Sequence, residues 1–321
     1  MDSSTPPEII HDFPPYFRVH KDGTIQRYFP QPEFAPPSSD PHSPVQSKDV
    51  LVSPETGVSA RLYLPTTTAL LRRPPQPGKR LPLLVHVHGG GFCLGSASTP
   101  IFHRFVNSLV AEANVAAVSV DYRLSPEHPL PIAYDDAWEV FRGAISIFRW
   151  VFSHQSGSGP DPWINDHVDF NRVFLGGESA GANIANNVAI RAGSSGVKVL
   201  GLVLVQPFLG GKEEEKMYKF MCPSSSGLDD DPRLNPAVDP GLPGMGCERV
   251  LFCIAEKDSM RERGWAYYEA LGKSGWVGER EIMESEGAGH AFHLFDPDCE
   301  KATVLLKRVA SFLNRPIEST S

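Results

Sequence analysis

Short apolar runs alternate with amphipathic segments along most of the chain. Runs such as Leu83–His88 and Val115–Val120 have the length and branched composition of buried strands. Segments such as 101–113 place apolar residues three or four positions apart, the spacing of a helix that packs by one face. This alternation predicts an α/β fold with a mostly parallel sheet flanked by helices on both faces. The predicted strands are 83–88, 115–120, 172–175, 200–205, 250–255 and 281–283, and the predicted helices are 101–113, 134–153, 182–192, 263–274 and 301–313.

Two segments fall outside this alternation. Residues 1–50 are rich in Pro, Ser and Asp but also carry aromatic residues, which pure linkers lack. We interpret them as an irregular arm that docks on the main body, and residues 66–80 as an exposed connection. A length of 321 residues allows two ordinary domains or one large α/β domain. We predict a single domain over residues 1–321.

Composition and charge narrow the class of protein. An apolar fraction of 41% and a charged fraction of 21% are typical of globular proteins. The net charge of −8 and the lack of a Lys/Arg-rich block argue against nucleic-acid binding. Apolar runs such as Val199–Val205 are far shorter than the roughly 20 residues that span a bilayer, so no membrane segment is expected.

The cysteines and the N-terminus indicate a cytoplasmic location. The five cysteines are scattered without a C-x-x-C pair, and no N-x-S/T glycosylation site occurs. The first residues are acidic and contain proline, without the basic flank and apolar run of a secretory signal. We therefore expect a reducing, cytoplasmic setting and no disulfide framework.

The sequence Gly177-Glu178-Ser179-Ala180-Gly181 matches G-x-S-x-G and lies between a predicted strand and a predicted helix. A serine on such a sharp turn is held in a strained backbone and needs small neighbours. The helix N-terminus that follows favours negative charge nearby. An ordinary turn is the alternative, but the flanking strand and helix favour Ser179 as a nucleophile.

Three consecutive glycines follow the predicted strand 83–88. Bare backbone is costly in chain entropy, so a function must require it. We predict that the amides of Gly89 and Gly90, together with that of Ala180, form an oxyanion hole. The alternative is a phosphate-binding loop, but Leu94 occupies the third glycine position of G-x-G-x-x-G, and no G-K-S/T follows.

His86 and His88 form an H-x-H pair, which is a fragment of some metal sites. No carboxylate or further histidine is spaced to complete such a site. We predict neither a metal nor a cofactor, and we interpret His88 as a structural residue of the glycine loop.

His290 is the predicted base. A serine hydroxyl needs an adjacent imidazole to take its proton, and His290 lies in the glycine-flanked segment 287–292 after a predicted strand. His293 is the rival, but it stands beside Leu294 and Phe295 and lacks flexible flanks.

Asp258 directly follows the predicted strand 250–255 and is the predicted partner of His290. Glu256 is the competing carboxylate, and Asp229–Asp231 are interpreted as a solvated run. The resulting order, Ser179, Asp258, His290, is the order of the α/β-hydrolases.

Four stretches resemble the plant carboxylesterase family, within the hormone-sensitive-lipase branch of the α/β-hydrolases. They are HVHGGGFCLGSAS, DYRLSPEHPLP, GGESAGANIA and EGAGHAFHLFDPD, and the similarity extends from about Phe13 to Leu313. The resemblance implies an α/β-hydrolase fold in which residues 1–50 and a shortened segment at 207–240 form a lid. It also implies a structural role near the site for DYRLSPEHPLP. The activity it implies is hydrolysis of small plant-metabolite esters through an acyl-enzyme.

Two related groups define the alternatives. Gibberellin receptors share the fold but have lost the catalytic histidine, whereas His290 is present here. The 2-hydroxyisoflavanone dehydratases typically carry Thr at the nucleophile position, where this chain has Ser179. A carboxylesterase is therefore favoured over a dehydratase-like or cyclase-like lyase, and a receptor is least favoured. Tyr16, Phe17, Tyr218 and Phe220 in the lid segments predict an apolar pocket for the substrate. The alternative is that these aromatic residues pack the arm onto the core.

Overall fold

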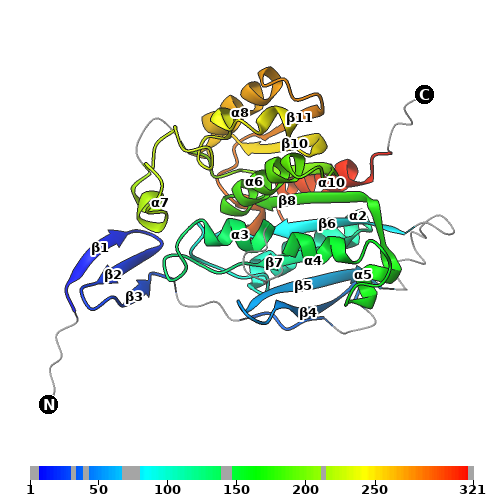
Figure 1. Cartoon of the computed structure of the whole chain (residues 1–321), viewed down its shortest axis with the longest axis horizontal. Helices are drawn as coiled ribbons and strands as arrows, with labels where there is room; N and C mark the ends of the chain where they lie inside the picture. The colour runs from blue at the N-terminus through cyan, green and yellow to red at the C-terminus, as the bar shows by residue number, and fades with distance from the viewer. Residues whose placement is uncertain are drawn as a thin grey trace, which may run out of the picture.

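The computed structural model describes residues 7–29, 34–38, 43–66, 80–138, 147–210 and 215–316. Within these ranges an eight-stranded sheet has the strand order β11-β10-β9-β8-β6-β7-β5-β4 (Figure 1). All neighbours from β7 to β11 are parallel, and β5 and β4 continue the sheet in antiparallel pairing. The predicted α/β class and mostly parallel sheet are confirmed. The strands are β4 (Val45–Ser53), β5 (Val58–Pro65), β6 (Leu81–Val87), β7 (Ala116–Asp121), β8 (Val168–Glu178), β9 (Val199–Val205), β10 (Cys247–Ala255) and β11 (Glu279–Ser285).

Helices cover both faces of this sheet. Leu83 and Val85 of β6 belong to one buried cluster and Leu84 to another, because successive side chains of a strand point to opposite faces. The first cluster includes α3 (Ile132–Trp138), α4 (Ile147–Ser153), α6 (Ala180–Ser194) and α8 (Arg261–Lys273); the second includes α2 (Pro100–Ala113) and α10 (Glu300–Asn314). The shorter helices are α5 (Pro162–His167), α7 (Lys216–Met221) and α9 (Phe292–Phe295), with single 3-10 turns at Pro236–Val238 and Leu242–Gly244.

Two predicted segments fall partly outside the described residues. The predicted helix 134–153 corresponds to α3 and α4, and residues 139–146 between them lie outside the described residues. Of the predicted connection 66–80, residues 67–79 also lie outside them.

The interpretation of residues 1–50 as an irregular arm is wrong for the described part of that range, which forms strands, whereas its expected docking on the main body is confirmed. β1 (Ile9–Phe13), β2 (Phe17–His20) and β3 (Ile25–Arg27) form a small antiparallel sheet. β4 begins at Val45 and belongs to the main sheet, so it crosses the predicted boundary of the arm. β4 is an edge strand with one exposed face. Because polar residues alternate along it, β4 contains no continuous apolar run that would predict a strand.

The small N-terminal sheet packs beside α7 (Figure 1). The ring of Phe220 on α7 lies 5.2 Å from that of Phe13 and 6.1 Å from that of Phe17, measured between centroids. On the opposite strand, the Arg27 guanidinium donates to both carboxylate oxygens of Glu127, each at 2.7 Å. These contacts fix the N-terminal sheet to two parts of the main body.

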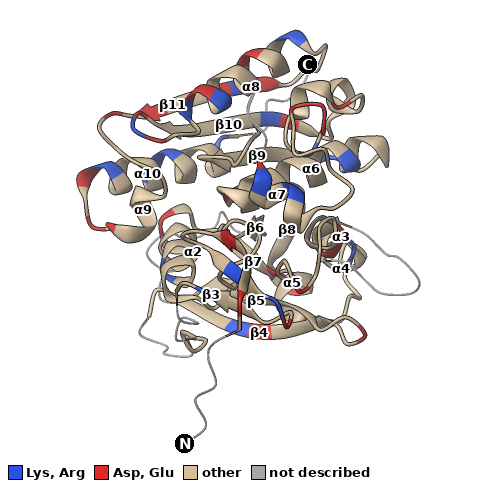
Figure 2. Cartoon of the chain, turned by 90° about the vertical axis from the view of Figure 1, so that its left-hand side faces the viewer, with Lys and Arg blue, Asp and Glu red and all other residues tan. Residues whose placement is uncertain are grey.

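The distribution of charged residues and the length of the helices relate to two expectations, that the protein binds neither nucleic acid nor a membrane. Along the ribbon in Figure 2, positions occupied by Lys or Arg are interspersed with positions occupied by Asp or Glu. Across the described ranges, every helix is too short or too polar to cross a membrane.

Candidate active site

Ser179 stands at the turn between β8 and α6, as the G-x-S-x-G context predicts. Its backbone angles are φ 54° and ψ −121°, a strained conformation for a residue with a side chain. A Cβ atom added to Gly177 would lie 2.4 Å from the carbonyl oxygen of Val87, and one added to Gly181 would lie 2.0 Å from it. Both glycines are therefore required because the turn crosses directly over the end of β6.

The structure brings Ser179, His290 and Asp258 together. His290 Nε2 lies 3.0 Å from Ser179 Oγ, and His290 Nδ1 lies 2.7 Å from Asp258 Oδ2. β8, β10 and β11 run parallel, so the turns that carry the three residues meet at one edge of the sheet. The Asp258 side chain is 2% exposed and accepts from Nδ1–H, which leaves Nε2 to accept the serine hydroxyl proton.

The rival base and carboxylate have other surroundings. Glu256 accepts the Gly287 amide at 2.5 Å and so supports the loop before His290. His293 is buried with its ring edge against Phe105, at 4.8 Å between centroids. Burial lowers the pKa of His293 to about 4, against the attraction of Glu178.

The prediction that Asp229–Asp231 are exposed to solvent is wrong for Asp231. Asp229 and Asp230 are exposed, but Asp231 is buried and accepts from the Arg233 guanidinium at 2.9 Å. Its hydrogen bonds to Arg233 and Ser225 outweigh the effect of burial and lower the pKa of Asp231. The Asp231–Arg233 pair therefore stabilises the loop after α7.

The prediction that Gly89 is an oxyanion donor conflicts with its hydrogen bonding. The Gly89 amide donates to Glu178 Oε1 at 3.0 Å, so it is already engaged within the protein. In the described part of the chain, the amides of Gly90, Gly91 and Ala180 have no such internal acceptor. Gly90 and Ala180 therefore remain candidates, and Gly91 takes the place of Gly89.

Neighbouring side chains hold the glycine loop in shape. Gly90 has a φ of 102°, and a Cβ there would lie 2.1 Å from the carbonyl oxygen of Leu94. His88 is fully buried and stacks on Tyr122 at 4.4 Å, and the Tyr122 hydroxyl donates to the His88 carbonyl at 3.1 Å. Burial lowers the pKa of His88 and favours a neutral ring. His88 therefore has the structural surroundings that were expected, as does the DYRLSPEHPLP stretch that supplies Tyr122.

A cavity of about 420 Å³ opens over Ser179 and His290. Of the four aromatic residues predicted for it, Tyr16 lines the wall. Phe17 and Tyr218 are instead fully buried in the core, and Phe220 packs against the N-terminal sheet. The wall also includes residues that sequence reasoning missed, because they are single positions spread over loops, strand ends and helices: Pro15, Arg27, Phe29, Leu94, Gly95, Thr99, Ile101, Phe102, Glu178, Ala291, Leu294 and Phe295.

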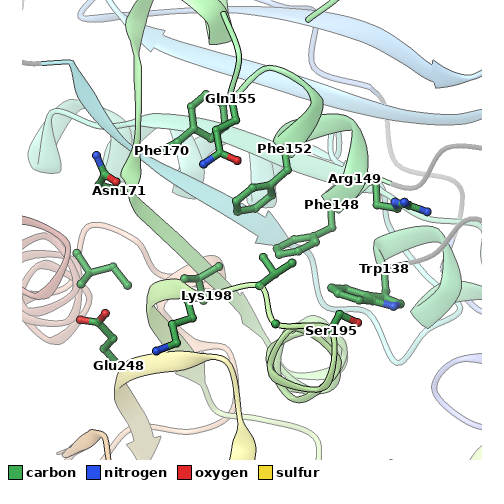
Figure 3. Close-up of a pocket in the computed structure, with 14 residues that line it drawn as sticks. Trp138, Phe148, Arg149, Phe152, Gln155, Phe170, Asn171, Ser195, Lys198 and Glu248 are labelled. Atoms are coloured by element: carbon green, nitrogen blue, oxygen red, sulfur yellow. The ribbon is translucent and has the colours of Figure 1, made fainter.

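A larger hollow of about 880 Å³ lies at the other end of the strands (Figure 3). Its walls include the aromatic rings of Trp138, Phe148, Phe152 and Phe170, with Lys198 at one side. None of the triad residues lies in it. The candidate chemistry is therefore concentrated in the smaller cavity.

The H-x-H pair has other partners than a metal. His86 Nε2 lies 2.7 Å from Glu178 Oε2, and His86 Nδ1 lies 3.3 Å from Ser119 Oγ. Among the residues with described positions, no three His, Cys, Asp or Glu side chains are grouped to hold a metal ion.

Comparisons with known proteins agree with this geometry. The family model of the alpha/beta hydrolase fold matches residues 84–294. Probable carboxylesterase 2 of Arabidopsis thaliana is 41% identical, covering 97% of this chain and 98% of that one. A 2-hydroxyisoflavanone dehydratase of Glycyrrhiza echinata is 38% identical, covering 97% and 98%. Among solved structures, the esterase LipW of Mycobacterium marinum superimposes with a TM-score of 0.67 at 26% identity, covering 85% of this chain and 82% of that one.

Proposed function

The chain belongs to the plant carboxylesterase family of α/β hydrolases, and from this premise we propose that it is a serine carboxylesterase acting on small, apolar esters. The observation that carries the proposal is the continuous hydrogen-bonded line from Ser179 through His290 to Asp258. Such a line converts a weak hydroxyl nucleophile into one that attacks an ester carbonyl.

Acylation begins when Ser179 Oγ attacks the ester carbonyl carbon and His290 Nε2 takes the hydroxyl proton. Asp258 keeps the imidazole in the required tautomer and stabilises its charged form. The amides of Gly90, Gly91 and Ala180 donate to the oxygen that becomes negative. His290 then gives the proton to the leaving alcohol, and an acyl-enzyme remains on Ser179. Water repeats the sequence to release the acid.

The cavity supports neutral substrates of modest size. Its volume of about 420 Å³ lies near the lower end of small-molecule sites. The cation in its wall, Arg27, is already bound to Glu127 and to the carbonyl oxygens of Cys93 and Ser125. An anionic substrate would therefore have to compete with these internal partners for Arg27.

The test combines covalent labelling with turnover. Diethyl p-nitrophenyl phosphate should transfer one diethylphosphoryl group to Ser179 Oγ and release p-nitrophenolate, which adds the mass of that group to the intact protein. A panel of p-nitrophenyl esters should be hydrolysed, with the shorter acyl chains preferred. Absence of both labelling and turnover would refute the esterase proposal.

A dehydratase is the second candidate, because relatives that bear that name are 38% and 36% identical to this chain. His290 would then move a proton of the substrate without an acyl-enzyme. Incubation with a 2-hydroxyisoflavanone distinguishes the two functions. Elimination of water that outpaces ester hydrolysis by the same preparation favours the dehydratase. A receptor would instead bind a ligand and leave it unchanged.

The proposal includes the location and the lid. We place the protein in the cytoplasm, which subcellular fractionation of a tagged chain tests.

The N-terminal sheet and the segment around α7 act as the lid, within one cooperative domain. A single unfolding transition seen by both circular dichroism and tryptophan fluorescence is the expected result.

A further inference from the structure

Glu178 is a fully buried carboxylate that the proposed reaction does not use. It stands directly before Ser179 at the end of β8, and its side chain is 1% exposed. Burial acts to raise the pKa of Glu178, but the attraction and hydrogen bond of His86 outweigh it, so the pKa is lowered. A charge is rarely kept in the interior without a set of partners, and those partners indicate its role.

The two oxygens of Glu178 bind two different segments. Oε1 accepts the Gly89 amide at 3.0 Å, and Oε2 lies 2.7 Å from His86 Nε2. The other ring nitrogen of His86 lies 3.3 Å from Ser119 Oγ on β7. Ser119, His86 and Glu178 therefore form a buried chain of hydrogen bonds across β7, β6 and β8 that ends at the glycine loop.

The glycine loop has no side chains of its own to fix its position. A Cβ on Gly89 would lie 2.9 Å from the Glu178 carbonyl oxygen, so the loop rests directly on the strand that carries the nucleophile. Glu178 holds the first amide of this loop, and the next two amides, of Gly90 and Gly91, are left for the substrate oxygen. Glu178 thus joins the serine and its oxyanion donors through buried hydrogen bonds.

Resting on the proposed esterase function, we infer that Glu178 is a positioning residue that orients the oxyanion donors relative to Ser179. Glu178 is also among the residues that line the cavity, but its carboxylate is 1% exposed and acts through the Gly89 amide, not on the substrate. Its acceptor geometry matters for catalysis, and its charge matters mainly for pairing with His86. Loss of the anchor should therefore weaken binding of the transition state and leave binding of the ground-state ester nearly unchanged.

The experiment compares Glu178→Gln with Glu178→Met, which is similar in length but has no acceptor oxygen. Turnover is expressed per site titrated with the organophosphate, so that unfolded molecules do not count. We expect Glu178→Gln to keep kcat within about threefold, since its amide oxygen still accepts from Gly89. Glu178→Met should lower kcat about 10- to 100-fold, less than full removal of an oxyanion donor, with KM changed by less than about threefold.

A second readout separates positioning from general damage. A trifluoromethyl ketone adds to the serine and forms an oxyanion, so its affinity should fall in Glu178→Met in parallel with kcat. If that variant does not fold, the double variant Glu178→Met/His86→Leu replaces both buried partners by apolar groups and avoids an unpaired histidine. The same loss is expected of it.

Two results would overturn the inference in an enzyme whose wild type is labelled and hydrolyses esters. One is an unchanged kcat per titrated site in Glu178→Met or in the double variant. The other is an equal loss in Glu178→Gln, which would assign the effect to charge. A wild type that is neither labelled nor active would instead refute the proposed esterase function, so the two failures are distinguishable.

Discussion

Tyr16 and Phe17 are adjacent in the chain but face different surroundings. Tyr16 lines the cavity above Ser179, and its ring would lie 2.7 Å from a Cβ placed on Gly91. Phe17 is fully buried in the main hydrophobic core. The N-terminal sheet therefore contributes both to the substrate site and to the stability of the fold, through neighbouring residues.

This division predicts that two alanine substitutions act on different properties, one on ester kinetics and the other on stability. Tyr16→Ala should change KM for p-nitrophenyl esters several-fold and destabilise the fold less than Phe17→Ala does, since Tyr16 packs against the core only as a partly buried wall residue. Phe17→Ala should lower the free energy of unfolding by about 3–5 kcal/mol. Ester kinetics and urea unfolding of both variants provide the check. Similar losses of stability in the two would contradict the division.

Ser179→Ala should lower kcat for p-nitrophenyl esters by about 10⁴-fold or more, because no other group can form the acyl-enzyme. The exposed Ser156, whose hydroxyl lies 2.8 Å from that of Ser158, provides the matched control. Ser156→Ala should retain full activity and full organophosphate labelling. Continued labelling of Ser179→Ala would identify a different nucleophile.

The two carboxylates after β10 should differ sharply in importance. Asp258 Oδ1 accepts the Met260 amide, so Asp258→Asn turns its NH2 donor toward His290 Nδ1 and favours the wrong imidazole tautomer; we expect kcat to fall by about 10⁴-fold. Glu256→Gln keeps an acceptor for the Gly287 amide and should change kcat by less than about threefold. Steady-state kinetics of this matched pair are decisive: a larger loss in Glu256→Gln would reverse the assignment of the acid.

Stability should depend on pH through His293. Its folded pKa is lowered to about 4 from a usual value of 6.5, so below pH 6.5 the unfolded chain binds more protons at this position. The free energy of unfolding should then decrease by up to about 1.4 kcal/mol per unit as the pH falls from 6.5 toward 4.

Urea unfolding at several pH values measures this slope. His293→Leu should make it shallower within the same window, whereas His167→Leu, at an exposed position, should leave it unchanged. An identical slope in wild type and His293→Leu would mean that other groups cause the acid sensitivity.

Gly181→Ala should destabilise the fold by about 3 kcal/mol or more, because the added Cβ would meet the carbonyl oxygens of Val87 and His88 at 2.0 and 2.5 Å. Gly244→Ala is the control, since a Cβ there meets nothing within 4 Å. The measurement is the thermal melt of both variants. A Gly181→Ala protein as stable as the control would show that the turn can shift away from β6.

The sequence was most informative where chemistry depends on strand ends. Ser179 and Asp258 each follow an apolar run that is readable as a strand, and His290 follows the mixed strand β11; parallel strands bring their ends together. The mostly parallel part of the sheet was predictable for the same reason. β4 and the N-terminal sheet were not, because edge and surface strands retain polar residues on their exposed faces.

Partners contributed by distant side chains were harder to predict. Nothing in the glycine run indicates that the Gly89 amide is engaged, since its acceptor, Glu178, is 89 positions away in the chain. A signal existed in retrospect: a carboxylate ends the apolar strand β8, and a histidine stands on neighbouring β6. The burial of Asp231 could not be predicted. It depends on a loop that folds inward and on a pairing with Arg233, and the sequence indicates neither.

The contact of Phe220 with Phe13 and Phe17 has a consequence for how this family diversifies. The two halves of the proposed lid are encoded about 200 residues apart, yet they meet through the aromatic cluster of Phe13, Phe17 and Phe220. A substitution that reshapes one half would disturb the other, so new substrate ranges should arise through paired changes in both regions. Chimeras that exchange only one half between relatives should lose more activity than those that exchange the two together.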